Sequence, residues 1–376
     1  MNTTVKKKKI GWLSHKWALA VISGICSIIF IHQNNTLSIN HYTFMHFLPN
    51  IVWTVLSVIT LCLCIFLFIR HIFFTKKKVD VLDKNEKYIL GFLFILFAIT
   101  VLDRIVLDLA SKAYIAATST TRPSGFIETM FYLAIQSRKI WLKGIEGTFE
   151  LSLFGTAFGF LLAILLVFLR IQEPTPRDSE NTQLLKLIGS TFSKIYVTVV
   201  RGTPMMVQVF IIYYGGFNIV KALMPNASVA EINNVYGFFT AGLVTVTLNT
   251  TAYITEILRG GIESIDKGQT EAARSLGFSS WQTMMKVVFP QAVKNSIPAI
   301  GNEFIINIKD TSVLNVIGVF ELMYATSTTA STYYQYLPTY VIAAIIYLVM
   351  TLILQKALAI IAKKLDAPAR PLPSSN

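Results

Sequence analysis

Long runs of apolar residues recur along this chain, and they restrict its fold more than any other feature. A helix needs about 20 mainly apolar residues to cross the hydrocarbon core of a bilayer. Eight runs come close to that length, and we expect membrane spans at about residues 17–35, 48–73, 88–108, 147–170, 195–219, 235–258, 296–318 and 338–362. The sequence therefore predicts an all-α, polytopic membrane protein.

The composition excludes an ordinary soluble domain. Hydrophobic residues make up 53% of the chain and charged residues 14%, and the mean hydropathy is +0.57, as is typical of a protein dissolved in the bilayer. The net charge of +13 is compatible with nucleic-acid binding. However, lysine and arginine cluster beside the apolar runs, where they orient membrane spans, so we expect no nucleic-acid partner.

The positions of the basic residues predict how the spans are oriented, because basic clusters mark the cytoplasmic side. Such clusters occur at residues 6–9, 76–78, 170–186, 259–286 and 363–364, whereas residues 32–50 carry no charge. Both termini are therefore predicted to be cytoplasmic, and three N-terminal spans bring the chain to the outside before residue 147. The basic residues in segment 112–143 are an exception that long loops tolerate. We expect no cleaved signal peptide, because the first run lacks a small-residue cleavage site.

A polar segment between two apolar runs, residues 270–290, has the pattern of two short helices joined by a turn. Thr270 is placed to cap the first helix, and Gly277 stands where a helix commonly ends in a left-handed residue. Ser279 and Gln282 have the spacing of a capping box at the start of the second helix. A folded element of this kind, in place of a plain loop, indicates a docking site.

The ends and faces of this segment add detail. Pro290 either stops the amphipathic run before it or opens the next span. Ala272 and Ala273 leave a small, flat helix face that another protein can approach closely. The alternative is a decorated connecting loop that has no partner.

The residues of the segment resemble the EAA signature of permease subunits in binding-protein-dependent ABC importers. That signature is Glu-Ala-Ala followed, at fixed spacing, by a glycine, an aliphatic residue, an apolar residue and a proline. The matching residues are Glu271, Ala272, Ala273, Gly277, Val287, Phe289 and Pro290. Phe289 is a mild departure, since leucine is usual there. A pattern of this length between two spans is specific.

Motifs on both sides narrow the resemblance to permeases for polar amino acids, of the histidine, glutamine, glutamate and arginine type. They are Tyr196, Arg201-Gly202-Thr203-Pro204, Gln208, Ala252-Tyr253, Glu256, Arg259-Gly260-Gly261-Ile262, Gly268-Gln269, Pro290-Gln291-Ala292, Pro298, Gly301-Asn302-Glu303-Phe304-Ile305 and Lys309-Asp310-Thr311-Ser312. The resemblance covers about residues 140–365 and leaves out residues 1–139.

The resemblance implies a fold and a division into domains. Residues 140–365 would form the five-helix core of a type I ABC importer permease, with residues 268–290 as its coupling segment. Residues 1–139 would add about three transmembrane helices and an outer amphipathic segment. The proline-rich residues 366–376 are expected to form a disordered cytoplasmic tail.

The resemblance also implies a function. The chain would be the permease subunit of an importer in a bacterial cytoplasmic membrane, moving a polar amino acid by alternating access. Its partners would be a second permease subunit, identical or not, an extracytoplasmic amino-acid-binding protein, and a separate ATPase that binds ATP and Mg. The sequence contains no Walker A loop and no catalytic or metal-binding motif. We therefore expect no cofactor on this chain and no enzymatic activity of its own.

Two groups of residues receive roles through the resemblance. The EAA residues 271–273 and Gly277 would couple the chain to the ATPase. Residues 201–204 would form the base of the pore and its gate, since glycine and proline together favour a helix break that must be buried or line a cavity. The alternative for residues 201–204 is a helix entry turn with a snorkelling arginine.

Polar residues on the seventh predicted span point to a route for the substrate. Glu303, Asn307 and Asp310 recur at i, i+4 and i+7 and so share one helix face, while Asn302 and Lys309 share a neighbouring face. Ionisable groups at membrane depth usually face a bundle interior or a water-filled cavity. This mixed-charge face, with Lys309 and Asp310 near the middle of the run, suits a zwitterion. The predicted pathway comprises Asn302, Glu303, Asn307, Lys309, Asp310, Thr311 and Ser312. An internal network that only fixes packing is an equal alternative.

Several alternatives stay open from the sequence. Residues 126–143 have the pattern of an amphipathic helix at the outer membrane surface or of a cap packed on the bundle. Gly155 and Gly159 form a GxxxG pair that favours close packing, within the subunit rather than between subunits. The cargo could instead be an opine or another small organic ion, and the chain could be an amino-acid sensor that does not transport.

Overall fold

The computed structural model describes residues 55, 58–62, 65, 106, 108–176 and 178–365. The chain divides into two compact units, Met1–Tyr132 and Leu133–Asn376. The three predicted N-terminal spans and the predicted tail lie almost entirely outside the described residues. In the first unit, α4 covers Asp108–Thr118, and the next helix, α5, covers Phe126–Gln136 and contains the boundary.

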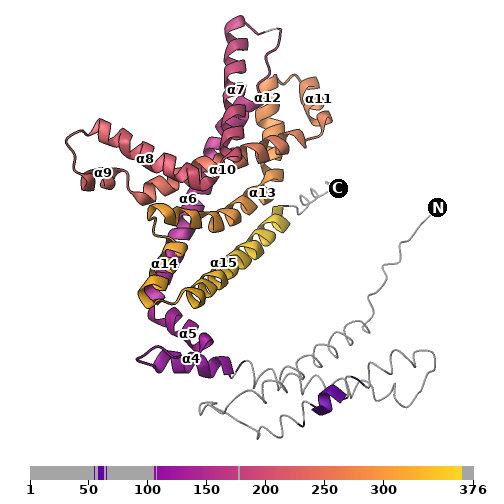
Figure 1. The fold of residues 1–376 in the computed structure, drawn as a ribbon. Coiled ribbons are helices and arrows are strands. Elements are labelled where there is room, and N and C mark those ends of the chain that lie inside the picture. The colour runs from indigo at the N-terminus through magenta and orange to yellow at the C-terminus, as the bar shows by residue number, and fades with distance from the viewer. Residues whose placement is uncertain are drawn as a thin grey trace, which may run out of the picture. The chain divides into compact units, whose positions relative to one another are not determined.

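The regular elements of the second unit are helices, joined by short loops, throughout its described residues (Figure 1). Its elements are α6 (Arg138–Arg170), α7 (Glu180–Gly202), α8 (Met205–Leu223), α9 (Val229–Val235), α10 (Phe238–Glu263), α11 (Lys267–Ser275), α12 (Ser280–Thr283), the π-helical turn η2 (Met284–Val288), α13 (Phe289–Asp310), the 3₁₀ turn η3 (Thr311–Ile317), α14 (Leu322–Tyr333) and α15 (Tyr336–Leu365). No strand occurs among the described residues, which confirms the predicted all-α class.

Three of the described helices are long and apolar enough to cross a membrane. They are Arg138–Arg170, Met205–Leu223 and Tyr336–Lys363. The predicted spans 147–170 and 338–362 fall within the first and last of these. The amphipathic pattern predicted over 126–143 is divided between two helices, because α5 ends at Gln136 and α6 begins at Arg138, with Ser137 between them.

α10 lies at the centre of the unit and packs against α6, α7, α8 and α13. Its close approach to α6 depends on the predicted glycine pair. A Cβ on Gly155 would lie 2.4 Å from the Val246 side chain, and one on Gly159 would lie 3.0 Å from Thr250. Without a hydrophobic force between helices in lipid, small residues at the interface allow van der Waals packing. The GxxxG pair therefore packs within the subunit, as predicted.

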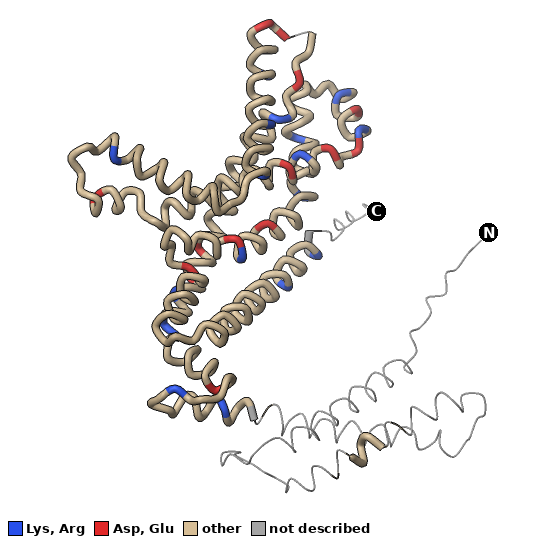
Figure 2. The backbone as a smooth tube through the Cα atoms, in the orientation of Figure 1, with Lys and Arg blue, Asp and Glu red and all other residues tan. Residues whose placement is uncertain are grey.

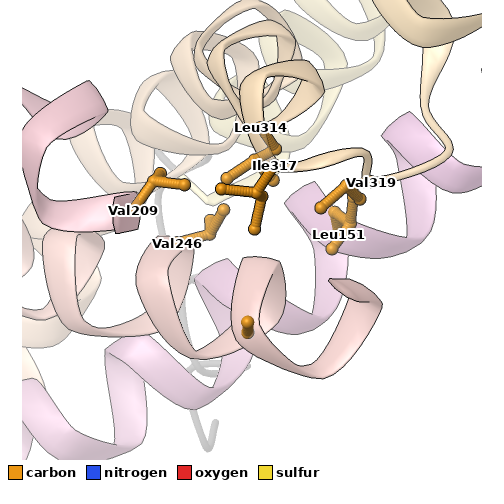
Figure 3. Packing of buried hydrophobic residues seen from close by; sticks show 7 residues of the cluster. Leu151, Val209, Val246, Leu314, Ile317 and Val319 are labelled. Atoms are coloured by element: carbon orange, nitrogen blue, oxygen red, sulfur yellow. The ribbon is translucent and has the colours of Figure 1, made fainter. Parts of the chain in front are cut away.

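A buried apolar cluster joins four segments of the unit (Figure 3). It consists of Leu151 from α6, Val209 from α8, Ala241 and Val246 from α10, Leu314 and Ile317 from η3, and Val319. Val209 is the only residue of α8 that is buried, so this cluster is the main apolar anchor of that helix. It also holds η3, whose 3₁₀ geometry is intrinsically weaker than that of an α-helix.

The polar linker between α6 and α7 is ordered by its own side chains. The Asp178 carboxylate lies 2.7 Å from Lys186 Nζ and accepts a 2.8 Å hydrogen bond from the Thr175 amide. These contacts, led by Lys186, lower the pKa of Asp178 to about 2. Ser179 then caps α7. The linker is short, because α7 already begins at Glu180.

Charged residues gather near this linker, at the end of α10 and on α11, whereas α8 and α15 carry few (Figure 2). Such a distribution separates a lipid-compatible part of the unit from a polar end. The polar end holds the segment that the sequence singled out.

Candidate functional site

The first helix of the predicted coupling segment starts earlier than expected. α11 runs over Lys267–Ser275, and its N-cap is Asp266, whose Oδ1 accepts a 2.6 Å hydrogen bond from the Gly268 amide. The predicted N-cap, Thr270, is wrong and lies inside the helix. Aspartate is among the strongest capping residues, so the earlier Asp266 takes the role.

The end of α11 follows the prediction closely. Gly277 adopts φ +86°, its amide donates to the Arg274 carbonyl at 2.9 Å, and the Phe278 amide donates to the Ala273 carbonyl at 3.2 Å. These two bonds form a Schellman motif. A capping box between Ser279 and Gln282 then opens α12.

The second helix of the segment continues into the bundle without a stop. α12 passes through η2 into α13, and Pro290 lies in the first turn of α13, directly after the π-helical turn η2. The alternative that Pro290 opens the next span is therefore correct. Phe168 of α6 contacts both Trp281 and Phe289, at ring-centroid distances of 5.7 and 4.9 Å, so the segment is tied to the end of α6.

The face of α11 that is open to a partner differs in part from the expected one. Glu271, Ala272 and Gly277 are exposed, but Ala273 is only 4% exposed and packs inward. Ala272 alone therefore fits the expected flat face. Leu276 and Trp281 are 80% and 58% exposed, and such apolar side chains at a polar end favour a protein contact. The sequence analysis does not name Leu276 and Trp281 as contact residues. Their places on either side of the turn at Gly277, between two polar helices, could have indicated that they are exposed.

The predicted helix break at residues 201–204 is confirmed. α7 ends at Gly202 and α8 begins at Met205, with extended backbone at Thr203 and Pro204. The single span predicted over 195–219 is therefore wrong. Because proline lacks an amide hydrogen and restricts the residue before it, helical geometry is disfavoured here. All four residues are exposed, and the Arg201 guanidinium lies over the Tyr253 ring at 5.3 Å.

The predicted seventh span, 296–318, also ends earlier. α13 stops at Asp310, and η3 follows until Gly318, whose φ is +88°. Lys309 and Asp310 therefore lie in the last turn of α13 and not in the middle of a span. Glu303, Asn307 and Asp310 still share one helix face, because all three lie within α13.

The structure separates the predicted pathway residues into two groups. Asn307 is 2% exposed, and its Nδ2 donates to Thr156 Oγ1 at 2.8 Å and to Thr250 Oγ1 at 2.9 Å. Thr311 is fully buried and donates to the Ile308 carbonyl. Asn307 and Thr311 therefore fit the alternative in which polar residues of the predicted span form an internal network that fixes packing.

The second group keeps free hydrogen-bonding capacity. Asn302 and Lys309 are exposed, and Ser312 is half-buried. Glu303 is 7% exposed and makes no hydrogen bond or ion pair with any described residue. Charges of both signs thus occur at the break and on the α13 face.

A chain of ion pairs joins the ends of α6 and α10. Glu256 lies 2.7 Å from Arg170 and 2.9 Å from Arg259, which in turn lies 2.5 Å from Glu263, the last residue of α10. The Arg170–Glu256 pair is close but lacks an aligned hydrogen bond, so charge attraction holds it. The i, i+3, i+7 spacing of Glu256, Arg259 and Glu263 signalled part of this chain, whereas Arg170 is too distant in sequence to be paired by eye.

We expect Glu256→Gln to lower the free energy of unfolding by about 1–2 kcal/mol, between the values for exposed and buried pairs. It would leave Arg170 and Arg259 facing each other with one fewer anion. Glu263→Gln, at a side chain that is 62% exposed, should cost less than about 0.5 kcal/mol. Thermal unfolding in detergent would compare them, and equal losses would contradict a central role for Glu256.

No group of three or more His, Cys, Asp and Glu side chains that could hold a metal ion occurs in the part of the chain that the structure describes.

Comparison with known proteins supports the importer resemblance. Residues 184–367 match the family described as "Binding-protein-dependent transport system inner membrane component". The probable glutamine ABC transporter permease protein GlnM of Bacillus subtilis (strain 168) is 32% identical over 227 residues, which cover 60% of this chain and 94% of that protein. The glutamine transport system permease protein GlnP of Escherichia coli (strain K12) is 34% identical over 213 residues, 57% of this chain and 87% of that protein.

Two further relatives differ in their stated cargo. The nopaline transport system permease protein NocM of Agrobacterium fabrum is 31% identical over 224 residues, 60% of this chain and 87% of that protein. Among solved structures, an amino acid ABC transporter with histidines matches 61% of this chain and 96% of its own, at 33% identity and a TM-score of 0.50. On this identity and coverage, the chain belongs to the family of binding-protein-dependent transport system inner membrane components.

Proposed function

We propose that this chain is the membrane-spanning permease subunit of a bacterial, ATP-driven importer for a polar amino acid. The observation that carries the proposal is the capped pair α11 and α12, which presents Glu271, Leu276 and Trp281 at the polar end of the unit. The similarity to glutamine permeases supports an amino acid as the cargo.

The other parts of the importer would be separate chains. A cytoplasmic ATPase binds ATP and Mg and docks on α11, since this sequence holds no Walker A loop. A second permease subunit completes the pore, and an extracytoplasmic binding protein delivers the amino acid. The basic residues around residues 259–286 favour a cytoplasmic coupling segment, with both termini on the same side. Residues 140–365 form the transport domain, and residues 1–139 form an added membrane region.

The contacts of α11 and α12 suggest how ATPase closure reaches the bundle. A push on α11 acts through α12 and η2 directly on α13. It also acts on α6, because Phe168 packs against Trp281 and Phe289. α6 and α13 would then move together, switching the bundle from inward-open to outward-open. Such a switch requires only that the ATPase bind one arrangement more tightly than the other.

The charges near the break suit an amino acid. Glu303 and Asp310 offer two carboxylates, and Arg201 and Lys309 offer two cations, so the group is neutral overall. A zwitterion placed between them pairs both its ammonium and its carboxylate without adding net charge to a low-dielectric site. Asn302 and Ser312 add hydrogen-bonding groups, while Asn307 and Thr311 are already engaged in bonds within the bundle.

We expect Glu303→Gln and Lys309→Gln each to raise the KM for uptake about ten-fold, because a charge-assisted hydrogen bond is worth about 1.5–3 kcal/mol and about 1.4 kcal/mol is a factor of ten. Lys294→Gln, an exposed lysine on the first half of α13, is the matched control and should leave the KM unchanged. Uptake of a labelled amino acid by cells would measure this, and an unchanged KM in both variants would remove these residues from the pathway.

The composition of the native complex tests the proposed function. Gentle purification through a tag on this chain should recover an ATPase, a binding protein and a second permease copy or a homologue. Mass spectrometry of the small molecules released from the complex should identify an amino acid. Recovery of the chain without any ATPase would contradict the proposal.

An opine is a second candidate cargo, favoured by the 31% identity to the nopaline permease. Competition of uptake separates the two, because an excess of unlabelled polar amino acid blocks an amino-acid importer. An excess of nopaline would block only an opine importer.

A further inference from the structure

We propose that Gln208 is a positioning residue that ties the break between α7 and α8 to α10 and thereby sets the place of Arg201. The inference rests on the proposed function, in which residues 201–204 form the gate. The inference gives a role to Gln208, for which the sequence analysis predicts none, and links the break to α10.

Gln208 satisfies the end of α7 from the first turn of α8. Its Nε2 lies 2.7 Å from the Val200 carbonyl, 3.0 Å from the Thr203 carbonyl and 2.9 Å from Thr203 Oγ1. The last carbonyls of a helix have no partner within it, and Pro204 has no amide to offer them. The side-chain amide of Gln208 therefore donates to carbonyls that backbone amides would satisfy if the helix continued.

The other atom of the same amide reaches the central helix. Gln208 Oε1 accepts a 2.9 Å hydrogen bond from Asn249 Nδ2, and Asn249 is only 7% exposed, in the middle of α10. Three acceptors around Nε2 and one donor at Oε1 leave a single favourable orientation of the amide. The side chain thus links the end of α7, the start of α8 and the middle of α10.

The position of this link relates directly to Arg201. The Arg201 guanidinium lies over the Tyr253 ring at 5.3 Å, and Tyr253 follows Asn249 by one helical turn, on the same face of α10. Tyr196 adds a third point, donating to the Leu248 carbonyl at 2.7 Å. A shift of the break along α10 would therefore move Arg201 off the Tyr253 ring.

A simpler role for Gln208 is that it only caps α7. The two roles differ in what Asn249 does, because Asn249 touches the amide but not the end of α7. Asn249→Leu cuts the tie to α10 and leaves all three capping contacts in place. If Gln208 positions the break, Asn249→Leu should lower the rate of uptake. If Gln208 only caps α7, Asn249→Leu should leave the rate of uptake unchanged.

The test measures ATP-driven uptake by the full complex for Asn249→Leu, Arg201→Gln and the double variant. We expect Asn249→Leu to lower the maximal uptake rate about ten-fold, as for loss of a buried hydrogen bond. The double variant should be no slower than Arg201→Gln alone, because residues that act through one another are not additive. Asn218→Leu, exposed further along α8, is the control and should transport normally. Normal uptake by Asn249→Leu would overturn the proposal. So would a double variant whose loss of rate equals the product of the two single losses.

Hydrogen exchange at the backbone amides of residues 199–209 gives a readout that does not need transport. In purified protein we expect exchange at least about ten-fold faster in Asn249→Leu than in the wild type or Asn218→Leu, since opening of the break becomes easier. If the wild-type complex failed to transport, the proposed function would fall, and this exchange would still test the tie. Unchanged exchange would overturn it.

Discussion

Replacing Gly277 with aspartate is expected to abolish uptake while leaving the affinity of the complex for its binding protein unchanged. Gly277 has a φ of +86°, a conformation that costs an L-residue roughly 1–2 kcal/mol. It also lies on the exposed surface between α11 and α12, beside the proposed ATPase contact. A carboxylate there would have to be desolvated on docking without a partner, which is costly.

Two variants at the same position separate the backbone from the charge. No atom lies within 4 Å of a Cβ placed on Gly277, so Gly277→Ala tests the backbone conformation without a clash. Gly277→Asn has nearly the shape of aspartate, tolerates the left-handed region and carries no charge. We expect both to retain much of the uptake, measured with labelled amino acid. Normal uptake by Gly277→Asp would remove this glycine from the coupling surface.

Gly147→Ala is expected to give the largest loss of stability among small substitutions in the bundle. A Cβ at this position would lie 2.3 Å from the Phe320 carbonyl oxygen, and backbone atoms cannot rotate away as a side chain does. Overpacking a well-packed site costs about 1–3 kcal/mol and occasionally more. The clash would also strain the neighbouring bond from the Leu322 amide to Thr148 Oγ1, 3.0 Å long, which holds α14 to α6.

A matched glycine provides the control for this stability prediction. Gly215 lies in α8 with nothing within 4 Å of an added Cβ, and alanine is the better helix former by up to about 1 kcal/mol. Gly215→Ala should therefore unfold at the same temperature as the wild type or higher, whereas Gly147→Ala unfolds lower. Equal unfolding temperatures, followed by the change in tryptophan fluorescence in detergent, would show that the α6–α14 contact is able to relax.

Features set by neighbours in sequence were predictable, and features set by distant contacts were not. The left-handed Gly277, the Ser279–Gln282 capping box and the break at Pro204 depend on local backbone preferences. Thr270 is also a capping type of residue, but α11 begins four residues earlier, where Asp266 takes the N-cap position.

The apolar run 296–318 predicts one span, but the number of apolar residues does not distinguish an α-helix from the 3₁₀ turn that ends before Gly318. The sequence analysis predicts no element at Leu322–Tyr333, where the structure has α14. Thr326 and Thr329 donate to carbonyls four residues earlier, at 2.7 and 2.8 Å, and so satisfy themselves inside a helix.

The spacing of polar residues predicts the polar face of α13. It does not show which side chains on that face already have hydrogen-bond partners inside the bundle. Asn307 bonds to Thr156 and Thr250, 151 and 57 residues away, and only the fold reveals such partners. The same holds for the Gln208–Asn249 tie, whose partners are 41 residues apart. Family resemblance marked Gln208 but gave it no role.

Reconstitution in proteoliposomes tests most directly that this chain is a transporting permease. The chain would be combined with its ATPase and binding protein, and labelled amino acid inside the vesicles would be followed after adding ATP and Mg. We predict accumulation that requires ATP and the binding protein and that is lost with Gly277→Asp. ATP hydrolysis stimulated by the loaded binding protein without any accumulation would contradict transport and would favour an amino-acid sensor.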